Sequence, residues 1–209
     1  MTGARATTRI LTPPLAYAAF EDRIARFHRP YYQALEVLLQ RRRERFGYAV
    51  LLDAHSMPGS VGVDLVLGTL EGMSCGDAVA KTAMSALAGT AERRSLLSVR
   101  RDDPYQGGEI VRTFGRPSAG VHALQLEVSR RLYMDEQVCR VLSWPGDLRP
   151  LDAERGPQHQ RGPGIPAPNR RRSRELHELV LRVRSLVRAL SANMPAPPQT
   201  RDAPTSPTP

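Results

Sequence analysis

The chain has 209 residues, of which 41% are hydrophobic and 24% charged, and its formal net charge is +9. This length allows one domain with a buried core, and two cysteines far apart in the sequence are too few for a disulfide framework or a cysteine-based zinc site. Because there is neither an apolar run of about 18 residues nor a secretory signal, we expect no membrane span and a cytoplasmic location.

The positive charge is concentrated toward the end of the chain. Residues 1–148 carry 19 Lys+Arg against 16 Asp+Glu, whereas residues 149–209 carry 11 against 5. A basic tail can bind nucleic acid, but aromatic residues make up only 5% of the chain and few are available to stack on bases. We therefore interpret the charge as compositional bias and expect no nucleic-acid partner. Steeply salt-dependent binding that is lost with residues 149–209 would favour the alternative.

The first predicted elements are a helix and a buried strand. After a flexible start at residues 1–14, apolar residues recur at helical spacing over residues 15–46. Pro30 is expected to break this helix because it has no N–H to donate, and Gly47 is expected to end it. The short apolar run at residues 48–52 is typical of a buried strand.

The middle of the chain alternates between strand and helix patterns. Strands are expected at residues 63–67, 96–99, 109–114 and 121–128, and a helix is expected at residues 74–88 with Ser74 as its cap. Strands separated by helices indicate an α/β fold with a mixed, partly parallel sheet flanked by helices.

The last third of the chain is predicted to contain one further helix. Residues 145–172 are rich in Pro, Gly and Arg and form a long loop in this interpretation. An amphipathic helix follows at residues 173–191, with Ser173 as its cap, and residues 192–209 form a disordered tail. The main domain is therefore expected to lie within residues 15–144.

The first polar segment with chemical potential is Asp-Ala-His-Ser at residues 53–56, directly after the first predicted strand. A histidine at this position can present its imidazole to a cleft, where a nearby carboxylate fixes its tautomer and the free nitrogen binds a metal ion. A histidine that is merely hydrogen-bonded at the end of a strand explains His55 equally well.

The second segment is the turn at residues 103–108, which is followed by Arg112. Pro, Tyr and two glycines in this order are typical of a turn, and they allow the backbone to approach a ligand closely. Arg112 could clamp a carboxylate with its planar guanidinium. On spacing alone, a hairpin turn with a surface arginine is the simpler interpretation.

The third segment is the predicted strand at residues 121–128, which contains His122, Gln125 and Glu127 among apolar residues. Burying such groups without partners costs about 2–7 kcal/mol for a neutral polar group and more for a charge. They should therefore meet each other, a metal ion or a substrate. A buried glutamate can act as the general base of amide hydrolysis. The structural alternative is an ion pair with Arg130 or Arg131.

Taken together, these segments resemble the N-formylglutamate amidohydrolase family. The family's patterns D-A-H-S, D-x-V-L-G-x-x-x-G-x-S-C, N-D-P-Y-x-G-G-x-x-x-R-x-x-G-x-P and G-V-H-A-L-Q-L-E-x-x-R-x-L-Y-M-D-E are found in the same order. They stand at residues 53–56, 64–75, 102–117 and 120–136. The resemblance implies a fold similar to the zinc carboxypeptidases, and it implies an amidohydrolase that converts N-formyl-L-glutamate to formate and glutamate in histidine breakdown.

The resemblance also implies roles for particular residues and a cofactor. By position, Glu127 is similar to the family's general base and His55 to a ligand of a divalent metal ion, expected to be zinc. Arg112 corresponds to a clamp for the carboxylates of a small substrate. Further substrate contacts are implied for Tyr105, Gly107, Gly108 and His122. The sequence gives no indication of the oligomeric state.

The sequence departs from the family pattern in several places. The early Pro-His-Ser/Ala-Gly motif and the later Asn-Arg segment have no counterpart, residues 30–32 read Pro-Tyr-Tyr where the family has Pro-Tyr-His, and Asp102 replaces Asn. A catalytic zinc usually takes three protein ligands, of which only His55 is nominated. The alternative is therefore a catalytically inactive or truncated family member that acts as a binding or remnant protein. The absence of a core strand would leave an exposed sheet edge.

Overall fold

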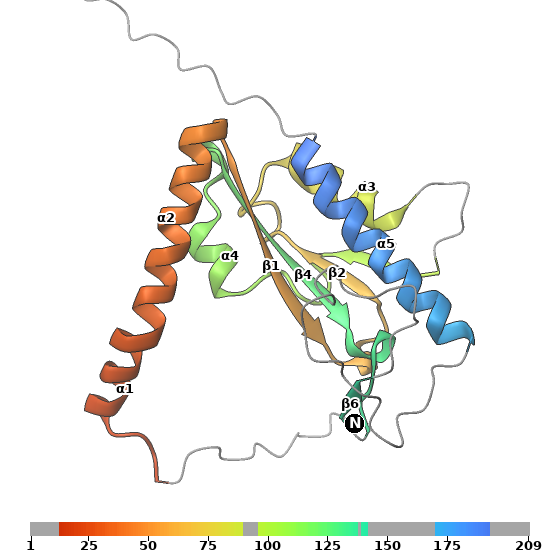
Figure 1. Cartoon of the computed structure of the whole chain (residues 1–209), viewed down its shortest axis with the longest axis horizontal. Coiled ribbons are helices and arrows are strands. Elements are labelled where there is room, and N and C mark those ends of the chain that lie inside the picture. The colour runs from red at the N-terminus through yellow and green to blue at the C-terminus, as the bar shows by residue number, and fades with distance from the viewer. Residues whose placement is uncertain (1–12, 90–95, 138, 142–169, 193–209) are drawn as a thin grey trace, which may run out of the picture.

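A computed structural model describes residues 13–89, 96–137, 139–141 and 170–192 of the chain (Figure 1). The helices are α1 (Tyr17–Arg23), the π-helix η1 (Ile24–His28), α2 (Arg29–Phe46), α3 (Asp77–Ala88), α4 (Glu109–Phe114) and α5 (Arg170–Ala192). The strands are β1 (Ala49–Met57), β2 (Leu65–Gly68), β3 (Val99–Arg101), β4 (Val121–Ser129), β5 (Met134–Asp135) and β6 (Arg140–Val141). Short 3-10 turns lie at Gly59–Val61, Pro117–Ala119 and Arg130–Leu132.

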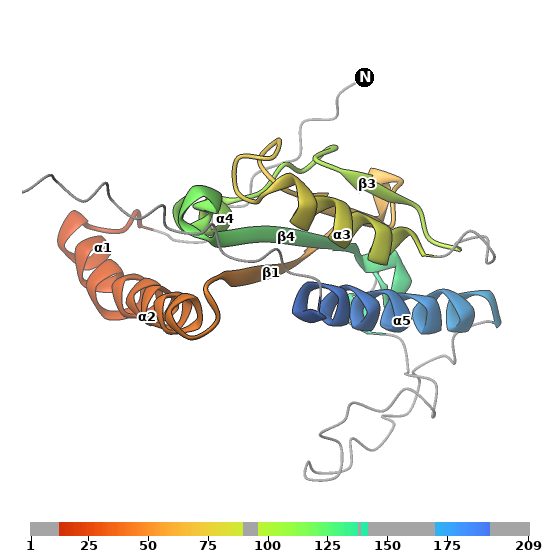
Figure 2. The ribbon, with the colours of Figure 1, turned by 90° about the horizontal axis from the view of Figure 1, so that it is seen from above.

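The main sheet has four strands in the order β1-β4-β2-β3. The pairs β1–β4 and β2–β3 are parallel and β2–β4 is antiparallel, which confirms the predicted mixed α/β sheet. In the described part of the chain β1 pairs only with β4, so its other edge is open, as expected. Helices α2 and α4 lie on one side of the sheet, and α3 and α5 lie on the other (Figures 1 and 2).

Two glycines fix the register of the parallel pair β1–β4. Gly47 ends α2 with φ 79° and Gly120 precedes β4 with φ 73°, conformations that are strained for residues with a side chain. The Ala49 N–H donates to the Gly120 carbonyl at 2.9 Å, and a Cβ on Gly120 would lie only 3.1 Å from the Gly47 oxygen. Both strands therefore start at the same level, with Ala49 opposite Val121.

The N-terminal helix does not break at Pro30 as predicted. The chain stays helical from Tyr17 to Phe46, with the single π-turn η1 before α2 and Pro30 in the first turn of α2. Proline is tolerated there because the first N–H groups of a helix have no partner within it. The prediction that Gly47 ends the helix is confirmed by its left-handed conformation and its hydrogen bond to the Arg43 carbonyl.

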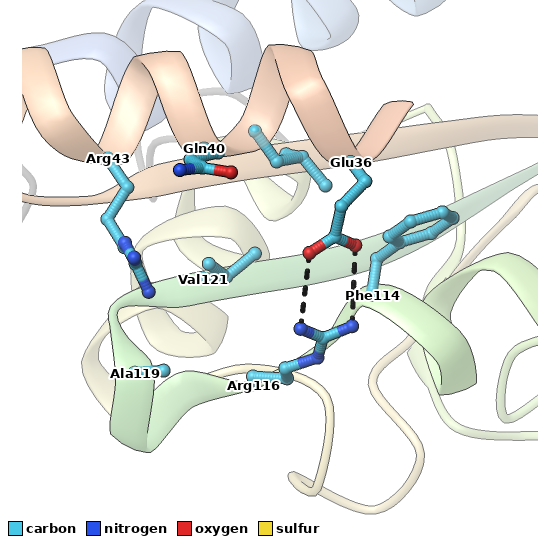
Figure 3. A pocket seen from close by; sticks show the side chains of 8 residues that line it. Glu36, Gln40, Arg43, Phe114, Arg116, Ala119 and Val121 are labelled. Atoms are coloured by element: carbon cyan, nitrogen blue, oxygen red, sulfur yellow. Dashed lines mark hydrogen bonds and ion pairs between the residues drawn. The ribbon is translucent and has the colours of Figure 1, made fainter. Parts of the chain in front are cut away.

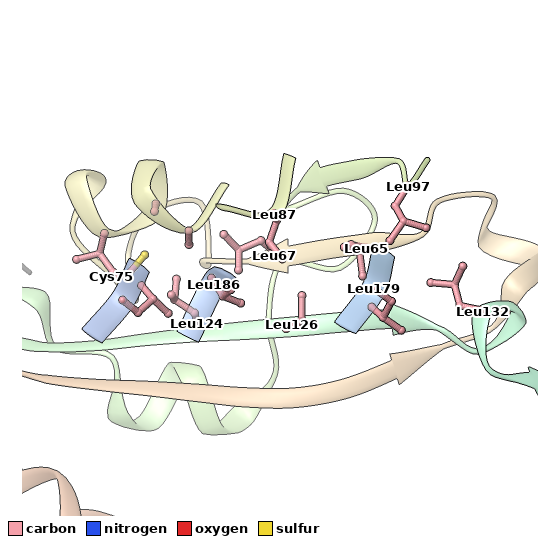
Figure 4. Packing of buried hydrophobic residues seen from close by; sticks show 14 of the residues in the cluster. Leu65, Leu67, Cys75, Leu87, Leu97, Leu124, Leu126, Leu132, Leu179 and Leu186 are labelled. Carbon is pink, nitrogen blue, oxygen red and sulfur yellow. The ribbon is translucent and has the colours of Figure 1, made fainter. Parts of the chain in front are cut away.

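The largest apolar cluster lies between the sheet and the helices α3 and α5 (Figure 4). Leucines from β2 and β4 meet α3, and α5 adds four leucines to the same cluster. The four are Leu176, Leu179, Leu186 and Leu190. The predicted C-terminal helix is therefore confirmed as part of the core.

The two predicted helix caps are wrong. Gly76 precedes α3, while the Ser74 hydroxyl donates to the Ala123 carbonyl of β4 at 2.8 Å. Helix α5 begins at Arg170, so Ser173 lies within its first turns. Helix α3 thus begins three residues after Ser74, and α5 begins three residues before Ser173.

The strand predicted at residues 109–114 is also wrong, because this segment forms α4. Its apolar residues Ile110, Val111 and Phe114 fall on one side of a helix and pack against the sheet and α2. A strand would place Ile110 and Val111 on opposite faces. Tertiary packing thus overrides the strand preference of the β-branched residues.

The remaining predictions concern two strands, the cysteines and the ends of the chain. The second strand is β2, the strand predicted at residues 96–99 is displaced to β3, and both cysteines are free. None of the helices in the described ranges is long and apolar enough to cross a membrane. The predicted flexible start, the long loop and the tail fall almost entirely on residues 1–12, 142–169 and 193–209, outside the described residues.

Candidate active site

One face of the sheet gathers polar side chains from β1 and β4. In the parallel register Asp53 lies beside Gln125, and His55 lies beside Glu127. Alternate residues of a strand point to the same face, so all four belong to the face that α2 and α4 partly cover. Residues 53–56 were predicted to follow the first strand, but they lie within β1, which runs on to Met57.

Glu127 is held by a chain of hydrogen bonds that starts in the loop before α4. The Gly108 N–H donates to Gln125 Oε1 at 2.7 Å, and Gln125 Nε2 donates to Glu127 Oε1 at 2.8 Å. Glu127 is only 7% exposed, and its Oε2 has no hydrogen-bond partner among the described residues. The predicted alternative, an ion pair with Arg130 or Arg131, is wrong, because these pair with other carboxylates.

Asp53 and His55 form a second polar pair beside Glu127. Asp53 Oδ2 lies 3.0 Å from His55 Nε2, and the aspartate side chain is only 12% exposed whereas the histidine side chain is 46% exposed. The pair adds one carboxylate and one imidazole to the polar face of the sheet. Within the described ranges, however, no group of three or more His, Cys, Asp or Glu residues could hold a metal ion. The described residues alone therefore do not form a complete zinc site.

The predicted turn lies over β2, next to this polar face. The Leu70 N–H donates to the Gln106 carbonyl at 2.7 Å, and a Cβ on Gly68 would lie 2.8 Å from the same oxygen. Gly107 has φ 126°, which favours glycine. Tyr105 packs against an apolar cluster of Met57, Val63 and Val66 at the end of the polar face. The turn is thus a loop between β3 and α4, and its backbone approaches the site closely.

Arg112 lies on α4 and not on a strand. Its side chain is 63% exposed, and its guanidinium pairs with Glu109, one helical turn earlier, at 3.3 Å. The structure therefore places Arg112 at the exposed surface of α4, where, within the described residues, its ion pair is with Glu109 and not with a carboxylate of the polar face.

His122 is not brought together with the other predicted site residues. It lies on the opposite face of β4 from Gln125 and Glu127, and its Nδ1 accepts a hydrogen bond from the Gly76 N–H at 3.0 Å. Burial lowers the pKa of His122 below its ordinary value, so the ring is neutral and accepts this bond. In this structure His122 therefore supports the start of α3.

The sequence did not nominate Tyr32 or Asp53 as site residues, and Gln125 was expected only to need a polar partner. The alternation of side chains along a strand could have identified Asp53 and Gln125. Each lies two residues before His55 or Glu127 and therefore points to the same face. Tyr32 was noted only as the residue that replaces the histidine of the family's Pro-Tyr-His pattern, and its contact with the apolar cluster beside the site comes from the packing of α2. Burial raises the pKa of Tyr32 above its ordinary value, and Glu109, Tyr31 and Asp53 raise it further.

A small cavity of about 70 Å³ lies elsewhere, between the C-terminal half of α2 and the start of β4 (Figure 3). The exposed ion pair between Arg116 and Glu36 borders it, together with Phe114 and Val121. Val121 is six residues before Glu127, or about 20 Å along an extended strand. The cavity is therefore not part of the polar face.

Comparisons with known proteins all lead to one family. The sequence profile of the N-formylglutamate amidohydrolase family matches residues 2–134. The N-formylglutamate deformylases of Pseudomonas putida and Pseudomonas aeruginosa are 36% and 39% identical to the chain over 115 residues, which are 52% of this chain and 42% of each enzyme. The crystal structure of N-formylglutamate amidohydrolase from Ralstonia eutropha matches with a TM-score of 0.57 and 25% identity, over 82% of this chain and 53% of that one. The chain thus spans about half the length of these relatives.

Proposed function

Because this chain belongs to the N-formylglutamate amidohydrolase family, we propose that it carries the water-activating part of a site that hydrolyses N-formyl-L-glutamate or a related N-acyl amino acid. The observation that carries this proposal is the buried carboxylate of Glu127. One of its oxygens is fixed by Gln125 and the other has no partner among the described residues. A carboxylate kept in this state is suited to accept a proton from a water molecule.

The reaction in this proposal is the hydrolysis of a linear amide. Water adds to the formyl carbon while Glu127 takes a proton from it, and the same carboxyl group then returns this proton to the leaving nitrogen. The C–N bond breaks, and formate and glutamate are the products. The backbone of the turn at Gly107 and Gly108 would contact the substrate, and Arg112 would clamp one of its carboxylates.

We extend the proposal to a divalent metal ion, zinc, with His55 as the ligand in this chain. Asp53 supports this, because a carboxylate 3.0 Å from the imidazole is the usual partner of a metal-bound histidine. The described residues do not complete the ligand set, so other ligands would have to join His55. The proposed cellular role is a step of histidine breakdown in the cytoplasm.

The incomplete ligand set favours a second candidate function. A family member without a complete metal site could bind the acyl amino acid and not hydrolyse it. The polar face, the turn and Arg112 would then serve as a binding site alone. The two functions differ in one measurable property, which is the release of formate.

The test measures zinc per purified chain and formate release from N-formyl-L-glutamate. Glu127→Gln should lower formate release by a factor of about 10²–10⁴ without changing the zinc content, because it removes the general base and not a metal ligand. Glu44→Gln is the matched control, since Glu44 is exposed on α2 and accepts a hydrogen bond from Gln40 on the same helix. His55→Ala should lower the zinc content.

Three outcomes separate the candidates. Formate release that depends on Glu127 supports the hydrolase. Binding of N-formyl-L-glutamate without formate release, in a folded wild-type chain, supports the binding protein. Formate release that is equal in wild type and Glu127→Gln would refute the assignment of the general base.

A further inference from the structure

The apolar contact between α2 and β1 borders the polar face of the sheet. The chain reverses its direction between the end of α2 and the start of β1, so both elements extend from this turn toward the same end of the molecule (Figure 1). Leu39 and Leu35 of α2 share an apolar cluster with Ala49 and Leu51 of β1. The next inward residue of the helix is Tyr32, and the next residue of β1 on the same face is Asp53. Tyr32 therefore lies where the core ends and the polar site begins.

The ring of Tyr32 is held on two sides. It stacks on His28 with a centroid distance of 4.0 Å, and it lies 5.3 Å from the ring of Phe114 in α4. Phe114 is buried, so one of these contacts is fixed by the core. An aromatic ring between two neighbours has little rotational freedom, and this gives its hydroxyl a defined position.

The hydroxyl of Tyr32 lies in a negative environment. Burial raises the pKa of Tyr32, and the carboxylates of Glu109 and Asp53 add to this effect from α4 and β1. The phenol therefore stays protonated at neutral pH and acts as a hydrogen-bond donor. Among the residues that the structure describes, no acceptor is bonded to it. A positioned donor at the edge of a polar site is suited to bind an oxygen atom of a ligand.

We propose that Tyr32 is a substrate-binding residue, whose hydroxyl donates a hydrogen bond to an oxygen of the bound N-acyl amino acid. This inference rests on the proposed function, because it requires such a ligand at the polar face. It assigns a role in binding to Tyr32 of α2, a position that the sequence marked only as a departure from the family's Pro-Tyr-His pattern.

The test compares two neighbouring tyrosines of the same helix. Tyr32→Phe removes only the hydroxyl and keeps the ring between His28 and Phe114. Tyr31→Phe is the matched control, because Tyr31 is 53% exposed and the substitution keeps its ring, whose centroid lies 6.0 Å from that of Tyr32. Binding of N-formyl-L-glutamate is measured by titration calorimetry in the full chain with Glu127→Gln, so that the ligand is not consumed. Formate release by the wild-type chain is measured in parallel.

We expect Tyr32→Phe to raise the Kd about tenfold, in keeping with the loss of one hydrogen bond to the ligand, and Tyr31→Phe to leave it unchanged. The unfolding midpoint of both variants should match that of the parent chain. If the parent chain binds and Tyr32→Phe binds equally well, this inference is overturned and the proposed function stands. An equal loss in both tyrosine variants would also overturn it. If the parent chain binds nothing and the wild type releases no formate, both proposals fail together.

Discussion

The unpartnered oxygen of Glu127 leads to a prediction that can be tested without substrate. A buried carboxylate with one unsatisfied oxygen costs stability, and residues are kept in such a state when function requires it. Glu127→Gln removes the charge but keeps the shape and the acceptor for Gln125 Nε2. We therefore expect this variant to be more stable than the wild type and less active.

The magnitude follows from the buried charge that is removed, because the amide nitrogen that replaces Oε2 is neutral but still lacks a partner; we take this change to be worth about 1–3 kcal/mol, the scale of one unsatisfied buried group. The free energy of unfolding should rise by this amount, which corresponds to an increase of roughly 2–12 °C in the unfolding midpoint of a domain of this size. Urea unfolding at pH 7, followed by circular dichroism, measures the change. The exposed control Glu44→Gln should match the wild type. A Glu127→Gln variant that is less stable than the wild type would refute the reasoning, because it would mean that the carboxylate has stabilising partners.

Three further predictions concern the core, the turn and the start of α3. Leu186→Ala should lower the free energy of unfolding by about 2–5 kcal/mol, because Leu186 is fully buried. Val187→Ala, at a half-exposed position of the same helix, should change it by less than about 0.5 kcal/mol. Equal effects of the two substitutions in urea unfolding would show that α5 is not packed on the core. Gly68→Ala should lower the free energy of unfolding by about 1–3 kcal/mol and weaken binding of N-formyl-L-glutamate, because its Cβ would clash with the Gln106 carbonyl. Unchanged unfolding and unchanged binding would contradict this position of the loop. Burial lowers the pKa of His122 in the folded chain, so as the pH falls below 6.5 this histidine is protonated in the unfolded chain before it is protonated in the folded one. The free energy of unfolding should therefore decrease as the pH falls below 6.5. His122→Asn, which cannot titrate, should reduce this pH dependence.

The sequence predicted the parts of the site that follow from local pattern. The run at residues 121–128 is apolar and β-branched enough to indicate a strand, and β4 occupies it. The polar residues within it were expected to be buried and to need partners, and Gln125 and Glu127 are indeed buried and bonded to each other. These predictions hold because a buried polar side chain in a strand must form a hydrogen bond to avoid a large energetic cost.

The parts that depend on neighbouring segments could not be predicted. Residues 53–56 are polar, which indicated the end of the strand, but β1 continues to Met57 because its polar residues pair with a polar stretch of β4. The segment at residues 109–114 has the composition of a strand, yet it becomes α4 because that conformation puts its apolar side chains on one side. In both cases the deciding contact lies far away in the sequence.

The alternation of side chains along β4 shows how more of the site could be obtained from sequence. Residues 125 and 127 have the same parity, so they must share a face of the strand, whereas His122 must point to the other face. A substrate contact by His122 and a general base at Glu127 therefore could not lie on one face of a regular strand, whatever the fold around it. The same rule groups Asp53 with His55 on β1. What parity cannot give is the register between the two strands, which Gly47 and Gly120 fix through their close backbone contact. A shift of one residue would turn the Asp53–His55 pair away from Glu127, so these two glycines determine whether the polar face exists.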